Sequence, residues 1–283
     1  MGVNDPLFEL RDLSFSYSDG TLVFDQVNMV IQPAEFRVLL APNGGGKSTF
    51  LKLLSGLLEP SEGVVLYRGR PVSEVPEEEL YGNIGFVFQN PDDQLFAATV
   101  KEDIAFGPRN LGFSDEEVER RIHESLEDVN LSLDLSKPVH RLSFGQRKRV
   151  ALAGVLAMGA ETLLLDEPTG ELDPMSQESI FGLLKTLNQE KDVTIVAATH
   201  HIDLLGSPFE KLCVFPGPDQ IVEGTPREIF SDEELLHKAS LRPPIAQTVS
   251  RILLEHGGLD PDHSMEADED LWDFLEEHFF QSF

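Results

Sequence analysis

The sequence contains a single cysteine, Cys213, so it can form neither an intrachain disulfide nor a zinc site built from several thiolates. It also lacks any uninterrupted apolar run of about 18 residues, the length that a membrane-spanning helix needs. Its first residues, MGVNDPLFEL, have neither the basic nor the apolar region of a signal peptide. We therefore expect a protein of the reducing cytosol that forms no membrane path by itself.

Basic residues are scarce, because 22 lysines and arginines stand against 50 acidic residues and give a formal net charge of -28. A protein with this negative net charge is repelled by the phosphate backbone of DNA or RNA. We therefore expect no nucleic acid as the main partner. An acidic surface also suits a high-salt cytoplasm, although a soluble protein biased toward Glu and Asp gives the same balance. With 283 residues, 41% of them hydrophobic, the chain can bury a full core and fits one large domain plus an appendage.

The apolar pattern predicts an α/β fold. Short, almost uninterrupted apolar runs predict strands at 36–41, 84–89, 162–166 and 193–199, and strands apolar on both faces belong in a covered parallel sheet. Helical patterns lie between them at 47–58, 114–129, 143–158 and 176–189. The second of these helices should begin with a capping box of Ser114 and Glu117. Its apolar stripe predicts core packing for Val118, Ile122, Leu126 and Val129.

The segment 260–283 differs in character, with nine acidic side chains and no lysine or arginine. Its apolar residues nevertheless share one helical face, which favours docking over a disordered acidic tail. These residues are Leu271, Phe274, Leu275, Phe279 and Phe280. His263 and His278 could form a weak metal site with nearby carboxylates, but runs of charge are usually solvated faces.

The segment APNGGGKS, residues 41–48, follows a predicted strand and opens a predicted helix, as a phosphate-binding loop does. Its glycines let backbone N–H groups turn inward, and the following helix dipole adds positive potential for the phosphates of ATP. An ordinary tight turn could have the same spacing. Ala41 occupies the place of the usual first glycine, which is acceptable only if that position needs no positive φ. The expected nucleotide ligands here are Asn43, Gly44, Gly45, Gly46, Lys47, Ser48 and Thr49.

A pair of acidic residues ends the apolar strand at 162–166 and supports the phosphate-site interpretation. Asp166, together with the Ser48 hydroxyl, can hold Mg²⁺, directly or through water. Glu167 would orient or deprotonate the water that attacks the γ-phosphate. Burying two carboxylates costs free energy, so their presence at the end of this strand indicates a functional role.

Together these motifs resemble the ABC ATPase family over roughly residues 7–235. The most diagnostic element is the signature LSFGQ at 142–146, followed by a basic RKR run, whereas the family usually has LSGGQ, so that Phe144 replaces the middle glycine. The resemblance implies a phosphate-loop NTPase core with a parallel sheet, an antiparallel β subdomain and a helical subdomain at about 92–148. It implies an ATPase domain at 1–235 and an acidic, partly helical extension at 236–283.

The resemblance also implies a head-to-tail dimer with ATP and Mg²⁺. The second subunit could be a sister ATPase, but both half-sites are complete in this chain, which favours a homodimer. In this arrangement each ATP lies between the phosphate loop of one subunit and Ser143, Gly145 and Gln146 of the other. Gln89 looks like the lid glutamine that senses Mg²⁺, Asp173 like the residue that couples the two sites, and His200 like the switch histidine. Tyr17 is similar to the adenine-stacking aromatic residue, with Phe15 as a competitor. The implied catalytic set is Glu167, His200, Lys47 and Gln89. By themselves, His200 and His201 would be taken for a surface pair after a strand.

The stretch 86–112, FVFQNPDDQLFAATVKEDIAFGPRNLG, is similar to the energy-coupling-factor importers, most closely their cobalt and nickel branch. The resemblance implies a peripheral subunit at the cytoplasmic face of the membrane, with a transmembrane coupling protein and a substrate-binding membrane protein as partners. Asp92, Asp93, Phe96 and Phe106 would contact coupling helices, unless the two phenylalanines fill the helical subdomain. Cobalt is the favoured cargo, nickel the next and a vitamin the third.

Two other functions are compatible with parts of the sequence. A non-transport ABC ATPase acting on DNA or ribosomes typically carries a long coiled-coil insertion or two tandem cassettes, and this sequence has neither. An inactive binding module is suggested by Ala41 and Phe144. The retained Lys47, Glu167 and His200 argue against inactivity.

Overall fold

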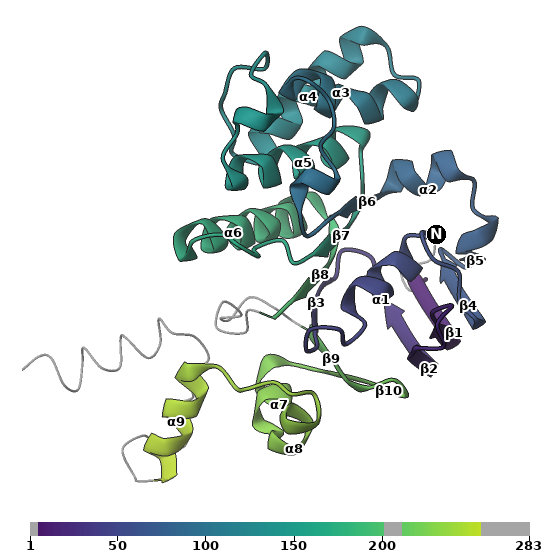
Figure 1. Ribbon diagram of the computed structural model, residues 1–283, viewed down its shortest axis with the longest axis vertical. Coiled ribbons are helices and arrows are strands. Elements are labelled where there is room, and N and C mark those ends of the chain that lie inside the picture. Colours follow the sequence, from purple (N-terminus) through teal and green to yellow (C-terminus); the bar gives the residue numbers. More distant parts are fainter. Residues whose placement is uncertain (1–4, 201–210, 256–283) are drawn as a thin grey trace, which may run out of the picture.

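The computed structural model describes residues 5–200 and 211–255, and their strands form two sheets (Figure 1). One sheet is antiparallel in the order β2-β1-β4-β5, and the other has the order β10-β9-β3-β8-β7-β6. The first contains β1 (Phe8–Ser16), β2 (Leu22–Ile31), β4 (Glu62–Tyr67) and β5 (Arg70–Pro71). The second contains β3 (Phe36–Leu40), β6 (Ile84–Val87), β7 (Thr162–Asp166), β8 (Thr194–Thr199), β9 (Lys211–Gly217) and β10 (Gln220–Gly224).

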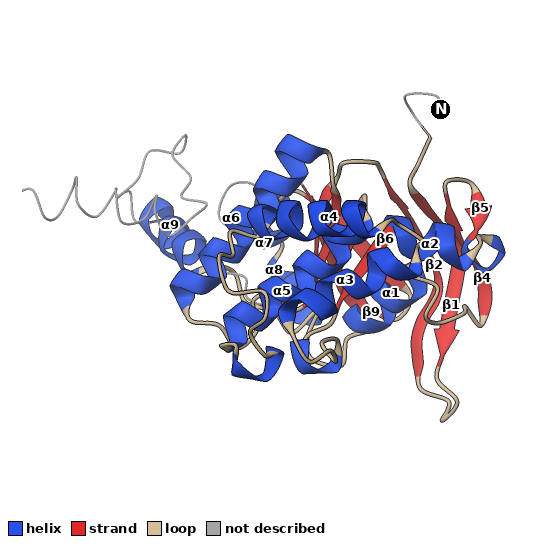
Figure 2. Ribbon diagram, turned by 90° about the horizontal axis from the view of Figure 1, so that it is seen from above, coloured by secondary structure: helices blue, strands red, loops and turns tan. Residues whose placement is uncertain are grey.

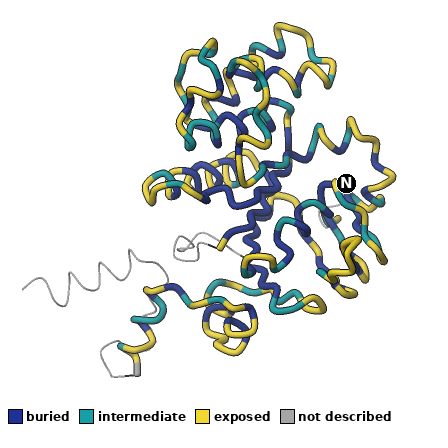
Figure 3. Tube along the Cα trace, viewed as in Figure 1, coloured by how far each residue is buried: buried dark blue, intermediate teal, exposed yellow. Residues whose placement is uncertain are grey.

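The second sheet confirms the predicted covered parallel sheet. Strands β6, β7, β8, β3 and β9 pair in parallel, and only β10 runs antiparallel to its neighbour β9. Alternate residues enter different cores, since Leu163 and Leu165 join one buried cluster and Leu164 joins the other. Both faces are therefore apolar, and the central strands form the buried middle of the molecule (Figure 3).

Helices cover this sheet on both faces, as the view from above shows (Figure 2). The helices are α1 (Lys47–Leu54), α2 (Glu77–Asn83), α3 (Val100–Asn110), α4 (Asp115–Asp128), α5 (Phe144–Met158), α6 (Pro174–Lys191), α7 (Pro226–Ser231), α8 (Glu233–Lys238) and α9 (Ile245–Glu255). Short 3-10 turns are η1 (Val72–Glu74), η2 (Pro91–Asp93) and η3 (Val139–Arg141). Helices α3, α4 and α5 pack together at one end (Figure 1). The predicted stripe of α4 is buried there, from Val118 to Val129.

Several predicted boundaries were wrong. The first helix ends at Leu54 and not at residue 58, because Gly56 adopts a left-handed φ of 76°. The strand predicted at 84–89 ends at Val87. The helix predicted from residue 176 begins at Pro174, because Asp173 caps it.

The capping box predicted for α4 is half formed. The Ser114 hydroxyl accepts a hydrogen bond from Glu117 N at 3.3 Å, as expected. The Glu117 carboxylate instead pairs with Arg120 and with Arg121, which lies 2.7 Å away. Two nearby guanidinium groups compete for this carboxylate, so it does not turn back to the Ser114 amide.

The sheet brings three segments that are distant in the sequence to one edge. Strand β3 pairs with β8 through Leu40 and Thr199, and β7 pairs with β8 through Asp166 and Ala198. The residues that follow these strands therefore emerge side by side, and α1 lies against β7 and β8. No helix in the described residues is long and apolar enough to cross a membrane. His201 and the predictions made for 260–283 lie outside the described residues.

Candidate nucleotide-binding and hydrolysis site

The phosphate loop has the backbone that its glycines suggest. Gly44 and Gly46 adopt φ values of 77° and 90°, and Gly46 is the N-cap of α1. Ala41 is buried and is not among the residues with positive φ, so a Cβ is tolerated where the family usually has glycine. The Lys47 ammonium donates to the Ala41 carbonyl at 2.7 Å, which holds its charge against the first residue of the loop.

Tyr17 is better placed than Phe15 to stack on a base. Its ring is 41% exposed, whereas Phe15 is 6% exposed, and the two rings meet edge to face with centroids 5.0 Å apart. The Tyr17 hydroxyl shares a hydrogen bond of 2.7 Å with the Thr49 hydroxyl. This bond ties the aromatic ring to the first turn of the helix that follows the phosphate loop.

Glu167 lies at the centre of a cluster of charged and polar groups. Its Oε1 is 2.9 Å from His200 Nδ1 and 3.6 Å from Lys47 Nζ, and its Oε2 accepts from His200 N at 3.3 Å. The residue is 4% exposed and has a φ of 48°, a left-handed backbone that costs about 1–3 kcal/mol in a non-glycine residue. The structure thus gathers Lys47, Glu167 and His200 as the sequence predicts.

Asp166 fits a magnesium ligand. Burial raises the pKa of its carboxyl, against a hydrogen bond from Ser48 that lowers it, and the neighbouring Glu167 raises it further. Its Oδ1 is buried without a hydrogen-bond partner among the described residues. A buried carboxylate oxygen beside the Ser48 hydroxyl is a donor set that Mg²⁺ prefers.

The signature residues lie at the start of α5. Ser143 is the N-cap, with Gln146 N donating to its hydroxyl at 3.2 Å and its own amide donating to the Gln146 side chain at 3.1 Å. Phe144 is half-buried and takes no positive φ, so its position also does not require glycine. No hydrogen bond among the described residues joins Ser143, Gly145 or Gln146 to the phosphate loop. In the described chain the signature and the phosphate loop are therefore two separate groups of residues.

Two further predicted residues have different surroundings. Asp173 caps α6 by accepting from Ser176 N at 3.0 Å and from the Ser176 hydroxyl at 2.6 Å, and these hydrogen bonds lower its pKa. Gln89 is exposed beyond the end of β6 and is not brought to the phosphate loop by any hydrogen bond of the described chain.

Gln94 holds the segment that carries Gln89, and sequence reasoning missed it. Its side chain accepts from Phe88 N at 3.2 Å and donates to the Ala151 carbonyl of α5 at 3.2 Å. No sequence signal distinguishes it from an ordinary polar loop residue.

Lys148 is a second residue next to the site that the sequence interpretation missed. It is 4% exposed, and its ammonium donates to the Glu167 carbonyl at 2.7 Å. Burial lowers its pKa to about 8, against nearby carboxylates that raise it. A signal does exist, because Lys148 shares a helical face with the buried Ala151, Leu152 and Val155 of α5.

The segment after Gln89 presents an apolar and acidic surface. Phe96 and Phe106 are 66% and 49% exposed, and their rings meet edge to face with centroids 4.7 Å apart. The interpretation that they fill the helical subdomain is therefore wrong. Asp92 pairs with Arg147 of the signature helix at 2.9 Å, which links this surface to the signature.

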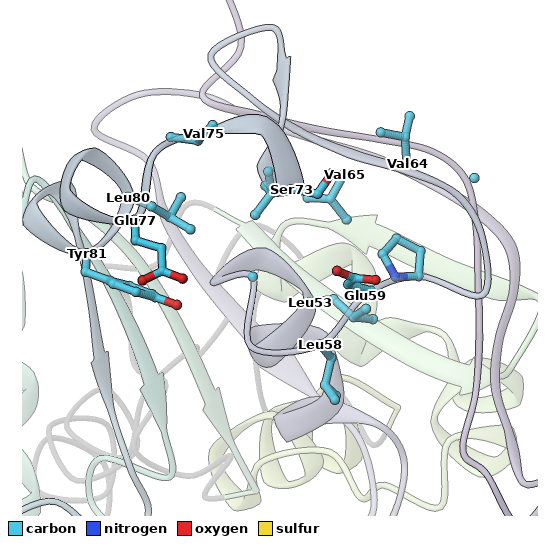
Figure 4. Close-up of a pocket in the computed structure, with 14 residues that line it drawn as sticks. Leu53, Leu58, Glu59, Val64, Val65, Ser73, Val75, Glu77, Leu80 and Tyr81 are labelled. Carbon is cyan, nitrogen blue, oxygen red and sulfur yellow. The ribbon is translucent and has the colours of Figure 1, made fainter.

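A pocket of about 560 Å³ lies between the end of α1, β4 and α2 (Figure 4). Leu80, Tyr81 and Glu77 of α2 form one wall, with Leu53 and Glu59 opposite. It contains no residue of the phosphate loop and neither Asp166 nor Glu167, so it is separate from the hydrolysis site.

A family model described as ABC transporter matches residues 24–170. The chain belongs to the ABC transporter family. It is 46% identical over 249 residues to the energy-coupling factor transporter ATP-binding protein EcfA of Methanocaldococcus jannaschii, covering 87% of this chain and 89% of that protein. These matches confirm the recognised family and an ATP-binding, ATP-hydrolysing subunit.

Solved ABC proteins share this fold. The structure of cbiO1 from Clostridium perfringens, described as part of the ABC transporter complex cbiONQ, matches with a TM-score of 0.74 and 39% identity over 84% of this chain and 96% of that chain. An ATP-binding cassette solved as a dimer with ADP and phosphate matches with a TM-score of 0.68 and 30% identity, over 77% of this chain and 98% of that one. The predicted ABC ATPase fold is confirmed.

Proposed function

We propose that this ABC subunit is the ATP-driven motor of an energy-coupling-factor importer. The observation that carries the proposal is the cluster of Glu167, Lys47 and His200 at the carboxyl edge of the parallel sheet, next to the phosphate loop. Similarity to EcfA and to cbiO1 supports the importer class. With membrane partners, the chain would act as a peripheral subunit at the cytoplasmic face.

Each residue of the site has a role in this proposal. The backbone N–H groups of Asn43 to Gly46 and the start of α1 bind the phosphates of ATP, and the Lys47 ammonium stabilises negative charge on them. Tyr17 stacks on the adenine, and Thr49 fixes the Tyr17 hydroxyl. Glu167 orients the attacking water and accepts its proton, while His200 holds the Glu167 carboxylate in place.

Magnesium would be held by Ser48 and Asp166, with Gln89 as a third ligand, and would supply positive charge that stabilises the phosphates of ATP. The residues present fit this ion because the buried Asp166 Oδ1 has no other partner among the described residues. The buried charge of Asp166 would then contribute to Mg²⁺ binding, although it destabilises the folded chain.

Two copies of the chain would complete each site. Ser143, Gly145 and Gln146 at the N-terminus of α5 would face the γ-phosphate held by the second subunit, where the helix dipole favours negative charge. Asp173 lies one residue before α6 and would connect the two sites across the dimer. The similar cassette solved as a dimer supports this arrangement.

The surface of Phe96 and Phe106, with Asp92 and Asp93 beside it, would contact the coupling helices of a transmembrane protein. Exposed aromatic side chains commonly anchor protein interfaces. Closure of the dimer on ATP would then move the docked helices as rigid bodies, and hydrolysis would release them. A separate membrane protein would capture the cargo.

We infer cobalt as the cargo, with nickel next and a vitamin third. The support is the resemblance of residues 86–112 to the cobalt and nickel branch and the likeness to cbiO1. The test is cobalt and nickel accumulation in cells lacking this protein, complemented by the wild-type chain or by Glu167→Gln. Uptake of one metal that only the wild-type chain restores supports the proposal. No response of either metal would reject the metal cargo and leave vitamins to be tested.

A further inference from the structure

The mechanism above does not use Lys148, although it is a buried cation next to Glu167. Its Nζ lies 2.7 Å from the Glu167 carbonyl oxygen. The carboxylates of Glu167, Glu171 and Asp166 all act on its charge. Because burying an ammonium group costs several kcal/mol, the presence of Lys148 at this position indicates that it has a function.

The Glu167 backbone shows what that function can be. Its φ of 48° directs the carboxylate toward Lys47 and His200, and such a conformation persists only where the surroundings enforce it. Three hydrogen bonds hold the peptide groups of Glu167. The amide donates to Ala198 O at 2.9 Å, and the carbonyl accepts from Gly170 N at 3.1 Å and from Lys148. Two of these bonds join backbone groups, and the third comes from the Lys148 side chain. A substitution of Lys148 can therefore remove this third bond.

Lys148 also belongs to the signature helix. Its ammonium lies 5.5 Å from the centre of the Phe144 ring, one helical turn earlier, within range of a cation–π contact. A continuous set of contacts thus runs from Phe144 in the signature, through Lys148, to the main chain of Glu167. In the proposed dimer the signature faces the second nucleotide, whereas Glu167 acts on the first.

We propose that Lys148 is a positioning residue that holds Glu167 in its left-handed conformation and connects the signature helix to the hydrolysis site of the same subunit. The inference rests on the proposed function and concerns the rate of hydrolysis. Lys148 makes no hydrogen bond to the phosphate loop among the described residues. Its removal should therefore slow the chemical step and leave ATP binding nearly intact.

The experiment compares Lys148→Met, Lys148→Arg and Glu167→Gln in the full chain assembled with its membrane partners. Methionine keeps the length of the side chain and removes the charge. A catalytic group displaced by about 1 Å can lose about 100-fold in rate, so we expect kcat of Lys148→Met to fall about 10- to 100-fold, with KM within about threefold. Lys148→Arg retains a cationic donor and should recover most of kcat.

Arg149→Met is the matched control. Arg149 lies on the same helix and donates to the Val129 carbonyl and, at 2.9 Å, to Ser179, away from the site. Its kcat should stay within about threefold of wild type. If Lys148→Met does not fold in thermal denaturation, Lys148→Gln takes its place under the same criterion.

Either of two results would overturn the inference: unchanged kcat in Lys148→Met, or an equal loss of kcat in Arg149→Met. Failure of the proposed function gives a different pattern, in which the wild-type chain hydrolyses ATP no faster than Glu167→Gln. An active wild-type chain, an inactive Glu167→Gln and a fully active Lys148→Met would reject the role of Lys148 alone.

Discussion

The hydrolysis site contains four charged residues that are buried in the protein interior. Lys47, Lys148, Asp166 and Glu167 are all buried at the carboxyl edge of one sheet. Sequence motifs predicted three of these four positions, because phosphate binding requires those residue types at that spacing. The left-handed φ of Glu167 and its bond from Lys148 were not predictable, since both depend on a tertiary contact between α5 and the residue that follows β7.

Asp166→Asn should stabilise the ligand-free protein. Burial raises the pKa of Asp166, so its ionised form is disfavoured by folding at neutral pH, and an amide removes that cost. We therefore expect a higher Tm without ligand. The additional Tm increase on adding ATP and Mg²⁺ should disappear. Thermal denaturation with and without both ligands measures this, and a lower ligand-free Tm would contradict the assignment.

Lys148 predicts a dependence of stability on pH. Its pKa falls from an ordinary 10.5 to about 8, so between these values the unfolded chain binds the proton that the folded chain has lost. Its contribution to the free energy of unfolding therefore rises with pH across this window. Relative to Lys148→Met, the wild-type Tm should increase between pH 8 and pH 10. A Tm difference that stays constant with pH would show that the ammonium is not desolvated.

At the scale of elements, the sequence predicted the parallel strands better than the antiparallel ones. Strands β3, β6, β7 and β8 are apolar on both faces, which gives continuous hydrophobic runs. Strand β1 pairs with β2 through shifted registers, and positive φ values at Asp12 of β1 and Gln26 of β2 interrupt the alternation of the two strands. The half-exposed antiparallel sheet was therefore expected only from the family resemblance.

A glycine of the phosphate loop, Gly46, and a glycine of α5, Gly154, should respond differently to substitution by alanine. Gly46→Ala strains a φ of 90° and places a Cβ 2.8 Å from Val23 Cγ1, so the loop must shift and ATP affinity should fall at least about tenfold. Gly154→Ala in α5 meets nothing within 4 Å and should stabilise the helix by about 0.5–1 kcal/mol. Titration with a fluorescent ATP analogue and thermal denaturation compare the two. Equal ATP affinity in both variants would contradict the proposed loop geometry.

At the scale of the whole molecule, the proposed function assigns partners to two surfaces, the N-terminal end of α5 and the surface of Phe96 and Phe106. The predicted domain division at residue 235 stays a prediction, as do the roles of the individual site residues. Sequence reasoning reached the class of protein because the phosphate loop, the signature and the acidic pair occur in one order. It could not show that Phe96 and Phe106 are exposed, since large apolar side chains more often lie in the core.

The double variant Phe96→Ser, Phe106→Ser should lose its membrane partners. Both rings are exposed, so the Tm of the isolated chain should change by less than about 2 °C. Co-purification with the coupling protein should drop at least about tenfold, since aromatic anchors commonly contribute about 2 kcal/mol or more. Leu22→Ser removes another exposed apolar side chain, 48% exposed, from the antiparallel sheet and serves as the control. Full co-purification of the double variant would exclude this surface.

In the proposed dimer, each hydrolysis site combines Glu167 of one subunit with Ser143 of the other. The ATPase activity of dimers made from two differently tagged chains tests this arrangement. Glu167→Gln on one chain and Ser143→Arg on the other place both defects in one site, so we expect about half of wild-type activity. Both substitutions on one chain, paired with wild type, damage each site once and should abolish activity. Equal activity of the two pairings would rule out a site shared between the subunits.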